Sequence, residues 1–282
     1  MKLKSYAVLA VFTLCAGIQA APPPPPSVRV YIFDCGNFNL NDPGRYSLKR
    51  EEMKTTLMSV ACFLVAHPKG TLMWDVGVIP DANLVSGMPL TQKLPIGSAY
   101  ASRSLGSQLS AIGYSPSDIT YLALSHFHFD HTANANMFAG ATWLVRQKER
   151  DLMFADPPDP RATVANFSAL KNSKTVIVKD NEHDVFGDGT VILKSAPGHS
   201  PDHQILFVKM AKTGPVVISG DLYHYPEELK LDRLPAADFN PEQTVASRKA
   251  IDAFIQKRHA QFWIQHDYAA NARRKKAPAF YE

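Results

Sequence analysis

Short apolar runs of strand length recur along most of this chain. Residues 28–34 alternate in polarity and are rich in β-branched and aromatic side chains, which predicts a strand. Residues 56–66 and 71–75 predict two more strands, joined across a turn at 67–70 that is expected to place His67 at the surface. Further strands are predicted over residues 121–124, 142–146, 175–179, 191–195, 205–210, 216–219 and 261–265.

Two longer segments have the spacing of a helix. Apolar residues in 99–112 recur three or four positions apart, and Gly113 follows as a suitable residue to end a helix. Residues 242–258 are amphipathic, with an apolar side made of Val245, Ile251, Phe254 and Ile255. Runs of strands followed by mixed units, in two rough halves, predict an α/β fold with two sheets between outer helices.

Residues 1–20 have the build of a secretory signal peptide. Lys2 and Lys4 precede an uncharged, largely apolar run at 6–18, and Ala20 provides a small residue at a cleavage position. The run is shorter than the roughly 20 apolar residues of a membrane span, so we expect no stable membrane anchor. These features predict a periplasmic or secreted protein that is cleaved after Ala20.

Behind this leader the chain divides into a short spacer and one domain. Residues 21–27 contain a run of prolines, which cannot join a helix or a central strand and predict a stiff polyproline spacer. Residues 28–282 suit a single domain with a sizeable core, since 45% of the full chain is hydrophobic. Export permits a disulfide between Cys35 and Cys62, and two buried free thiols are the alternative.

The charge of the chain gives no reason to expect a polyanionic partner. The sequence has 30 lysine and arginine residues against 26 aspartate and glutamate residues, a formal net charge of +4. This balance favours neither nucleic acid nor a membrane surface as a partner. We therefore expect no nucleic acid as a partner, and a homodimer is compatible with the sequence.

The densest chemistry lies at residues 125–131, Ser-His-Phe-His-Phe-Asp-His, directly after the strand predicted at 121–124. Three imidazoles and a carboxylate this close together are costly to bury unless they have partners. On an extended loop, His126 and His128 point to the same side and toward one ion. Asp130 and His131 fall on the following turn, where they can face a second ion. Imidazoles with carboxylates suit zinc, although other divalent metals accept the same donors.

The spacing of these residues matches an HxHxDH motif, and with it the chain resembles the metallo-β-lactamase superfamily. Four more motifs in the same order carry the resemblance: Trp-Asp-Val-Gly at 74–77, Ala-Pro-Gly-His at 196–199, Ser-Gly-Asp at 219–221 and Gln-His-Asp at 265–267. The resemblance covers nearly all of the mature chain. It implies an αββα sandwich, in which two mixed β-sheets pack between outer helices.

The resemblance also implies a site for two Zn²⁺ ions. It assigns seven ligands: His126, His128 and His199 to one ion, Asp130, His131 and His266 to the other, and Asp221 to both. Asp75 would hydrogen-bond a ligand imidazole and fix its tautomer, and the alternative is a turn residue that ends a strand. His203, close to His199 in sequence, is expected to support the site or the fold.

The ligand set and several local segments favour one branch of the superfamily. A bridging carboxylate such as Asp221 is a feature of its thioesterase, phosphodiesterase and lactonase branches. The segments at 29–36, 67–70 and 263–267 look like the N-acyl-homoserine lactonase family, whose members are quorum-quenching enzymes. This resemblance implies that a hydroxide shared by both metal ions opens the ring of an acyl lactone, with Asp130 moving the proton.

Other functions remain open on the sequence alone. On the same fold, the substrate can be a glutathione thioester, a β-lactam or a phosphodiester. A periplasmic zinc-binding protein without turnover is the alternative outside enzymes, but an open coordination position would be surplus to storage.

The chain departs from the lactonase family directly after Asp221. In that family a tyrosine three residues after the bridging aspartate assists the substrate carbonyl, whereas here that position is His224, between Tyr223 and Tyr225. A phenol remains protonated at neutral pH and can donate to a developing oxyanion. We expect Tyr223 to take this role through a one-residue shift of the loop, with His224 as the alternative.

Overall fold

The computed structural model describes residues 21–85 and 88–282, so the predicted signal peptide at 1–20 lies outside the described residues. The proline-rich segment contains neither helix nor strand, but it contacts the domain: Pro25 is buried and Pro22 lies beside Gly113. Among the described residues, no helix is long and apolar enough to cross a membrane.

Two β-sheets, each with parallel and antiparallel neighbours, form the centre of the fold. The first has nine strands, of which β14 (Phe280–Tyr281) pairs with β1; the others are, in spatial order, β4 (Leu90–Leu94), β5 (Gly97–Ala101), β1 (Arg29–Leu40), β2 (Leu57–His67), β3 (Gly70–Trp74), β6 (Tyr121–Ala123), β7 (Thr142–Val145) and β8 (Thr175–Ile177). The second has five strands, in the order β13 (Gln261–Trp263), β12 (Gly214–Ile218), β11 (Gln204–Met210), β10 (Val191–Ser195) and β9 (Glu182–Asp184).

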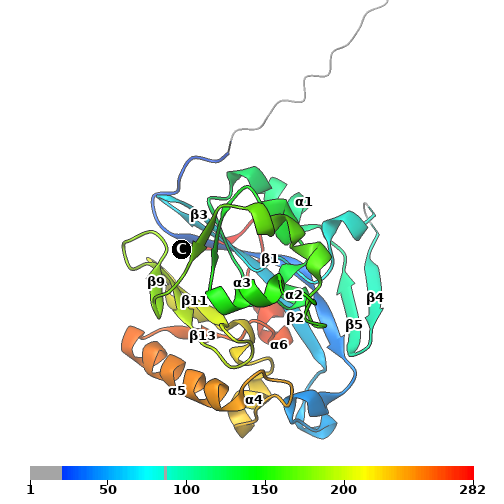
Figure 1. The fold of residues 1–282 in the computed structure, drawn as a ribbon. Coiled ribbons are helices and arrows are strands. Elements are labelled where there is room, and N and C mark those ends of the chain that lie inside the picture. Colours follow the sequence, from blue (N-terminus) through cyan, green and yellow to red (C-terminus); the bar gives the residue numbers. More distant parts are fainter. Residues whose placement is uncertain (1–20, 86–87) are drawn as a thin grey trace, which may run out of the picture.

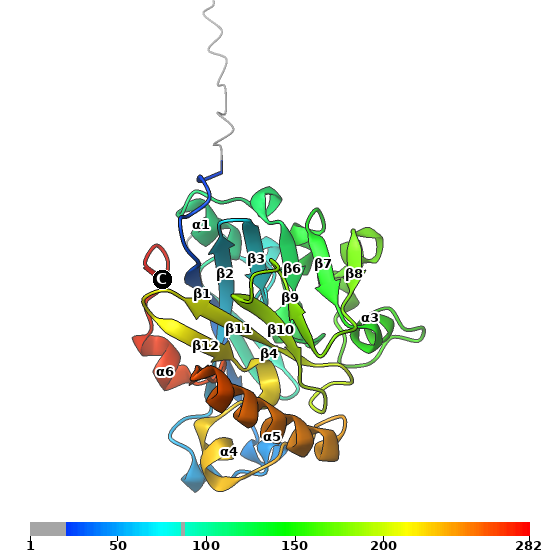
Figure 2. The same ribbon diagram turned by 90° about the vertical axis from the view of Figure 1, so that its left-hand side faces the viewer.

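Helices cover the outer faces of the two sheets, as Figures 1 and 2 show. On the side of the first sheet lie α1 (Leu105–Ser110), α2 (Phe129–Thr132) and α3 (Gln147–Met153), and on the second sheet lies α5 (Pro241–Arg258). Two short helices, α4 (Pro226–Leu231) and α6 (Tyr268–Arg273), follow β12 and β13 in the chain. This order of layers confirms the predicted αββα sandwich.

Strand β1 shows how the layers are held together. Its side chains alternate between the two faces of the sheet. Val30 and Ile32 face the core between the sheets, whereas Tyr31 and Phe33 face the core beneath the helices. Because both faces are covered, the strand is apolar on both sides. Its sequence alone therefore does not predict which side chains face the core between the sheets and which face the core beneath the helices.

The predicted strands from residue 56 onward correspond to β2, β3, β6, β7, β8, β10, β11, β12 and β13. The helix predicted at 99–112 is wrong in its first part, because Gly97–Ala101 is strand β5. The backbone of β5 pairs with β1 on one side and with β4 on the other. The helix that remains is α1, which begins after Ser104, whose side chain accepts from the backbone N–H of Ser107.

The predicted exposure of His67 and the predicted burial of Val245 are also wrong. His67 is only 2% exposed, because the loop between β9 and β10 folds over it: its ring stacks on Phe186 at 4.1 Å and its Nε2 lies 3.0 Å from Asp188. In α5, Ile251 and Phe254 are buried as predicted, but Val245 is 51% exposed. The first turns of α5 instead bury polar residues against the loop at 197–198.

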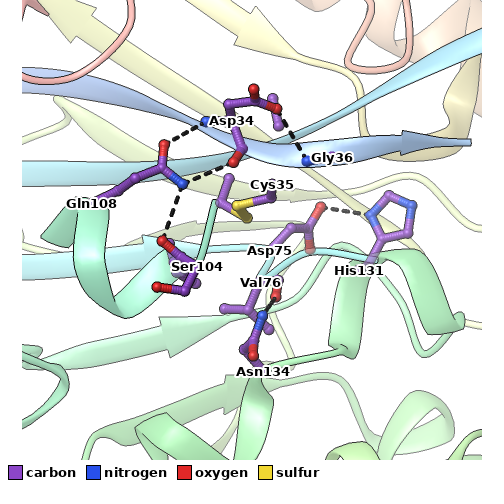
Figure 3. Close-up of a disulfide and its surroundings, with 12 residues drawn as sticks. Asp34, Cys35, Gly36, Asp75, Val76, Ser104, Gln108, His131 and Asn134 are labelled. Carbon is purple, nitrogen blue, oxygen red and sulfur yellow. Dashed lines mark hydrogen bonds and ion pairs between the residues drawn. A yellow bond between two sulfur atoms is a disulfide. The ribbon is translucent and has the colours of Figure 1, made fainter. Parts of the chain in front are cut away.

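Two long-range links tie down β1. Cys35 and Cys62 form a disulfide between β1 and β2, with their Cα atoms 5.9 Å apart (Figure 3). At the other end of the domain, the side chain of Glu282 accepts hydrogen bonds from Ser27 and from Lys212. Since Lys212 lies in the turn between β11 and β12, Glu282 connects the segment after β14 in the first sheet with the second sheet.

Candidate metal centre

The chemistry-bearing residues all lie on segments that follow strands, in loops, in the short helix α2 or in the 3₁₀ turn Gly220–Leu222. Parallel pairing of β3 with β6 and of β12 with β13 directs the loops after these strands toward the same end of the sandwich. These segments contribute Asp75 after β3, residues 126–131 after β6, His199 after β10, Asp221 after β12 and His266 after β13.

The structure brings the seven expected ligands together in two groups. His126, His128, His199 and Asp221 form one group, and Asp130, His131 and His266 form the other. Within each group the nearest ligand atoms all lie within 4.8 Å of one another. This is the division of side chains expected from the sequence.

Asp221 lies between the two groups and presents one oxygen to each. Its Oδ2 is 3.5 Å from His126 Nε2 and 3.3 Å from His199 Nε2. Its Oδ1 is 3.0 Å from Nε2 of both His131 and His266. The carboxylate is 3% exposed, so its charge needs partners inside the protein.

The donor set fits divalent metal ions. Nδ1 of His128 lies 2.8 Å from Nε2 of His126 and 3.1 Å from Nε2 of His199, so three ring nitrogens converge on one point. Burial lowers the pKa of His126 and His128 well below 6.5, which leaves both rings in the neutral form that binds metals. Oδ1 of Asp221 is buried without a hydrogen-bond donor. This combination of imidazole nitrogens and carboxylate oxygens suits divalent metal ions such as zinc.

Asp75 makes the hydrogen bond expected of it. Its Oδ2 accepts from Nδ1 of His131 at 2.8 Å (Figure 3), which leaves Nε2 of that ring free to face the centre. The same carboxylate accepts from the backbone N–H of Ser125 at 2.7 Å and from Nε2 of Gln265 at 2.7 Å. Asp75 therefore links loops from both sheets.

Two further histidines of the centre are oriented by oxygen atoms outside it. Nδ1 of His266 donates to the backbone carbonyl of Ser59 at 2.7 Å. Nδ1 of His199 lies 3.0 Å from Oδ1 of Asp238, whose Oδ2 accepts from Thr244 at 2.7 Å. Sequence reasoning missed Asp238, because no motif surrounds it.

His203 and Gly198 shape the loop that carries His199. The ring of His203 donates from Nδ1 to the carbonyl of Ala196, and its Nε2 accepts from the backbone N–H of Asp221 at 2.9 Å. It therefore supports the site, as expected. Gly198 has φ +137°, and a Cβ there would lie 2.3 Å from the backbone nitrogen of Thr244, so only glycine fits.

The expectation that Tyr223 donates to the substrate carbonyl beside the metal ions is wrong. Tyr223 follows the short 3₁₀ turn Gly220–Leu222 with extended backbone, and its side chain belongs to the hydrophobic cluster beneath α5. Its ring lies 3.9 Å from the guanidinium of Arg248 and packs on Phe262. His224 lies at the centre instead, with Nε2 3.1 Å from Oδ2 of Asp221.

His224 is held between two carboxylates. Its Nδ1 lies 3.3 Å from Oε1 of Glu228 in α4, on the side opposite Asp221. Glu228 in turn accepts from Arg248 at 2.9 Å. Sequence reasoning gave no role to Glu228 or to Tyr46, whose ring covers His224 at 4.2 Å between centroids.

Comparison with known proteins places this geometry in a family. Residues 55–260 match the model of the metallo-β-lactamase superfamily. The N-acyl homoserine lactonase AttM of Azorhizobium caulinodans is 28% identical over 242 residues, which cover 79% of this chain and 87% of that protein. AttM of Agrobacterium fabrum is 30% identical over 233 residues, with the same coverage.

Solved structures show the same fold. A quorum-quenching N-acyl homoserine lactone lactonase superimposes with a TM-score of 0.74 at 22% identity, covering 90% of this chain and 98% of the other. AidC, a dizinc quorum-quenching lactonase, gives a TM-score of 0.64 at 18% identity, covering 90% and 92%. The motifs, the two ligand groups and these relatives together identify the chain as a metal-dependent hydrolase of the metallo-β-lactamase superfamily, related to the N-acyl homoserine lactonases.

Proposed function

We propose that this protein opens the lactone ring of N-acyl homoserine lactones and does so with two zinc ions. The observation that carries the proposal is Asp221, which presents one oxygen to each ligand group. A bridging carboxylate keeps two ions at the short spacing that dinuclear hydrolases need. The relatives named N-acyl homoserine lactonases, at up to 30% identity, support this substrate class.

The reaction adds water to the lactone carbonyl carbon, breaks the bond from that carbon to the ring oxygen, and transfers a proton to the ring oxygen. Bound zinc would act as a Lewis acid and lower the pKa of water toward neutrality. Asp130, whose Oδ2 is 3.7 Å from Nε2 of His266 in the second ligand group, would carry the proton. Asp75 and Asp238 hold ligand imidazoles in one tautomer.

The test is a comparison of substrates with purified, zinc-loaded protein. We expect kcat/KM for N-hexanoyl homoserine lactone to exceed that for a β-lactam, a glutathione thioester and a phosphodiester. Metal analysis should give about two ions per chain, and chelation should abolish hydrolysis. A higher kcat/KM on one of the other substrates would replace the lactone, and full activity without metal would remove the metal centre from the mechanism.

We also propose that the protein acts outside the cytoplasm, after removal of residues 1–20. The disulfide supports this, because such bonds persist in oxidising compartments. The intact mass of protein isolated from the periplasm or medium of the producing cell should correspond to a chain that begins at Ala21. A full-length cytoplasmic species as the main product would contradict the proposal.

A further inference from the structure

A tyrosine from a distant part of the chain reaches the metal centre. Tyr46 ends the 3₁₀ turn Pro43–Tyr46, which lies beside α4 in both views (Figures 1 and 2). Its ring centroid is 4.2 Å from that of His224, whose Nε2 is 3.1 Å from Asp221. Tyr46 is therefore separated by one imidazole from the carboxylate that lies between the two ligand groups.

The ring of Tyr46 is held in place by its neighbours. Tyr225 packs edge-on against it at 5.5 Å, and the hydroxyl of Tyr225 is anchored on the carbonyl of Thr56 at 2.9 Å. The preceding residue, Arg45, accepts a backbone hydrogen bond from Ala236 at 2.8 Å. These contacts fix the turn to the segment that follows Asp221.

The hydroxyl of Tyr46, in contrast, has no partner among the hydrogen bonds of residues 21–85 and 88–282. Tyr46 is half-buried, so part of the residue is in contact with solvent. Burial raises the pKa of the Tyr46 phenol most, and the nearby Asp221, Tyr225 and Asp130 raise it further. A phenol is protonated at neutral pH and is thus a hydrogen-bond donor there.

The other candidates for a donor at this place are already engaged or turned away. Each ring nitrogen of His224 faces a carboxylate, that of Asp221 or that of Glu228. Tyr223 packs against Arg248 on the far side of the turn. Of the three, Tyr46 alone lies beside the centre with a donor that makes neither a hydrogen bond nor an ion pair among residues 21–85 and 88–282.

We propose that Tyr46 is a catalytic residue, which donates a hydrogen bond from its hydroxyl to the carbonyl oxygen of the lactone as that oxygen gains negative charge. This inference rests on the proposed lactone hydrolysis. Tyr46 keeps its proton throughout: water adds to the carbonyl carbon, and the proton that reaches the ring oxygen does not come from the phenol. A preorganised donor at such an oxyanion raises kcat, because the interaction strengthens in the transition state.

The experiment compares three variants with the wild type on N-hexanoyl homoserine lactone, with zinc content and kcat and KM measured for each. Tyr46→Phe keeps the ring on His224 and removes only the hydroxyl, whereas Tyr46→Leu removes both. Tyr223→Phe is the matched control, since its hydroxyl lies away from the centre. We expect Tyr46→Phe to lower kcat at least tenfold with KM and zinc content near wild type, and Tyr223→Phe to behave as wild type.

Each other outcome has a distinct meaning. Wild-type kcat in Tyr46→Phe with loss of activity in Tyr46→Leu would overturn the inference, because the ring alone would then matter. Loss of zinc in Tyr46→Phe would overturn it as well, in favour of a structural role. An inactive wild type would overturn the proposed function and this inference with it, whereas an active wild type with an unimpaired Tyr46→Phe variant would overturn the inference alone.

Discussion

At the scale of single residues, His199 depends on a partner that lies outside every motif. Asp238 lies 39 positions further along the chain, in the loop before α5, and its side chain is bonded to both His199 and Thr244. A carboxylate on Nδ1 keeps the proton on that nitrogen and leaves Nε2 free to bind metal. Asp238 thus does for one ligand group what Asp75 does for the other.

Replacing Asp238 with alanine should weaken zinc binding without unfolding the protein. Loss of the hydrogen bond lets His199 rotate and lowers its basicity, and such outer partners typically contribute about 10–100-fold in metal affinity. Competition with a chromogenic chelator measures the affinity directly. Asp252→Ala, an exposed carboxylate on α5, is the control and should bind zinc as wild type does. Equal affinities in both variants would show that Asp238 does not orient His199.

Single residues were predictable from the sequence where a local spacing or a motif marked them. Residues 126–131 are neighbours in the chain, so backbone geometry alone predicts that their histidine and aspartate side chains point toward a common site. Asp238 and Tyr46 are brought to the centre only by tertiary folding, and the sequence around them gives no signal. Whether the side chain of Tyr223 or that of His224 lies beside Asp221 depends on the 3₁₀ turn Gly220–Leu222. The sequence motif alone does not predict this turn.

At the scale of elements, β1 changes its pairing at a bulge between Asp34 and Asn37. Gly36 in this bulge has φ +107°, and a Cβ there would lie 2.2 Å from the carbonyl oxygen of Tyr100 in β5. Cys35 lies in the same bulge and bonds to Cys62 in β2. The segment enclosed by the disulfide includes the turn that carries Tyr46.

The double substitution Cys35→Ser with Cys62→Ser should lower the free energy of unfolding by about 2–4 kcal/mol. A disulfide with a sequence separation of 27 restricts the unfolded chain, and its removal restores that freedom. Denaturant titration measures the change. Wild-type protein unfolded in the presence of a thiol reductant should have the midpoint of the double variant, and a variant as stable as the oxidised wild type would contradict the expectation.

Element types were predictable where packing agrees with local pattern. Strand β2 is a largely apolar run with burial on both faces, so its composition already indicates it. The segment at 99–112 shows the limit, because its apolar spacing is compatible with a helix while β1 and β4 pair with its first residues. Pairing with strands far away in sequence decided the outcome.

At the scale of the whole molecule, the metal centre joins the two sheets. Asp75 and residues 126–131 belong to the first sheet, whereas His199, Asp221 and His266 belong to the second. Hydrophobic patterning predicted two sheets between helices, but it could not predict which loops meet. That information came from the order of five short motifs, and the structure gives its physical basis in the parallel strands whose ends share one side.

The link made by Glu282 has a consequence for how this chain could be rearranged. Since the side chains of Ser27 and Glu282 meet, the beginning and the end of the folded domain are neighbours in space. A linker of a few residues would join them, and new ends could then be opened in an exposed loop away from the metal centre. The fold should therefore tolerate a different order of its strands and helices along the chain. A circularly permuted protein should form the same sheets and bring the same ligands together.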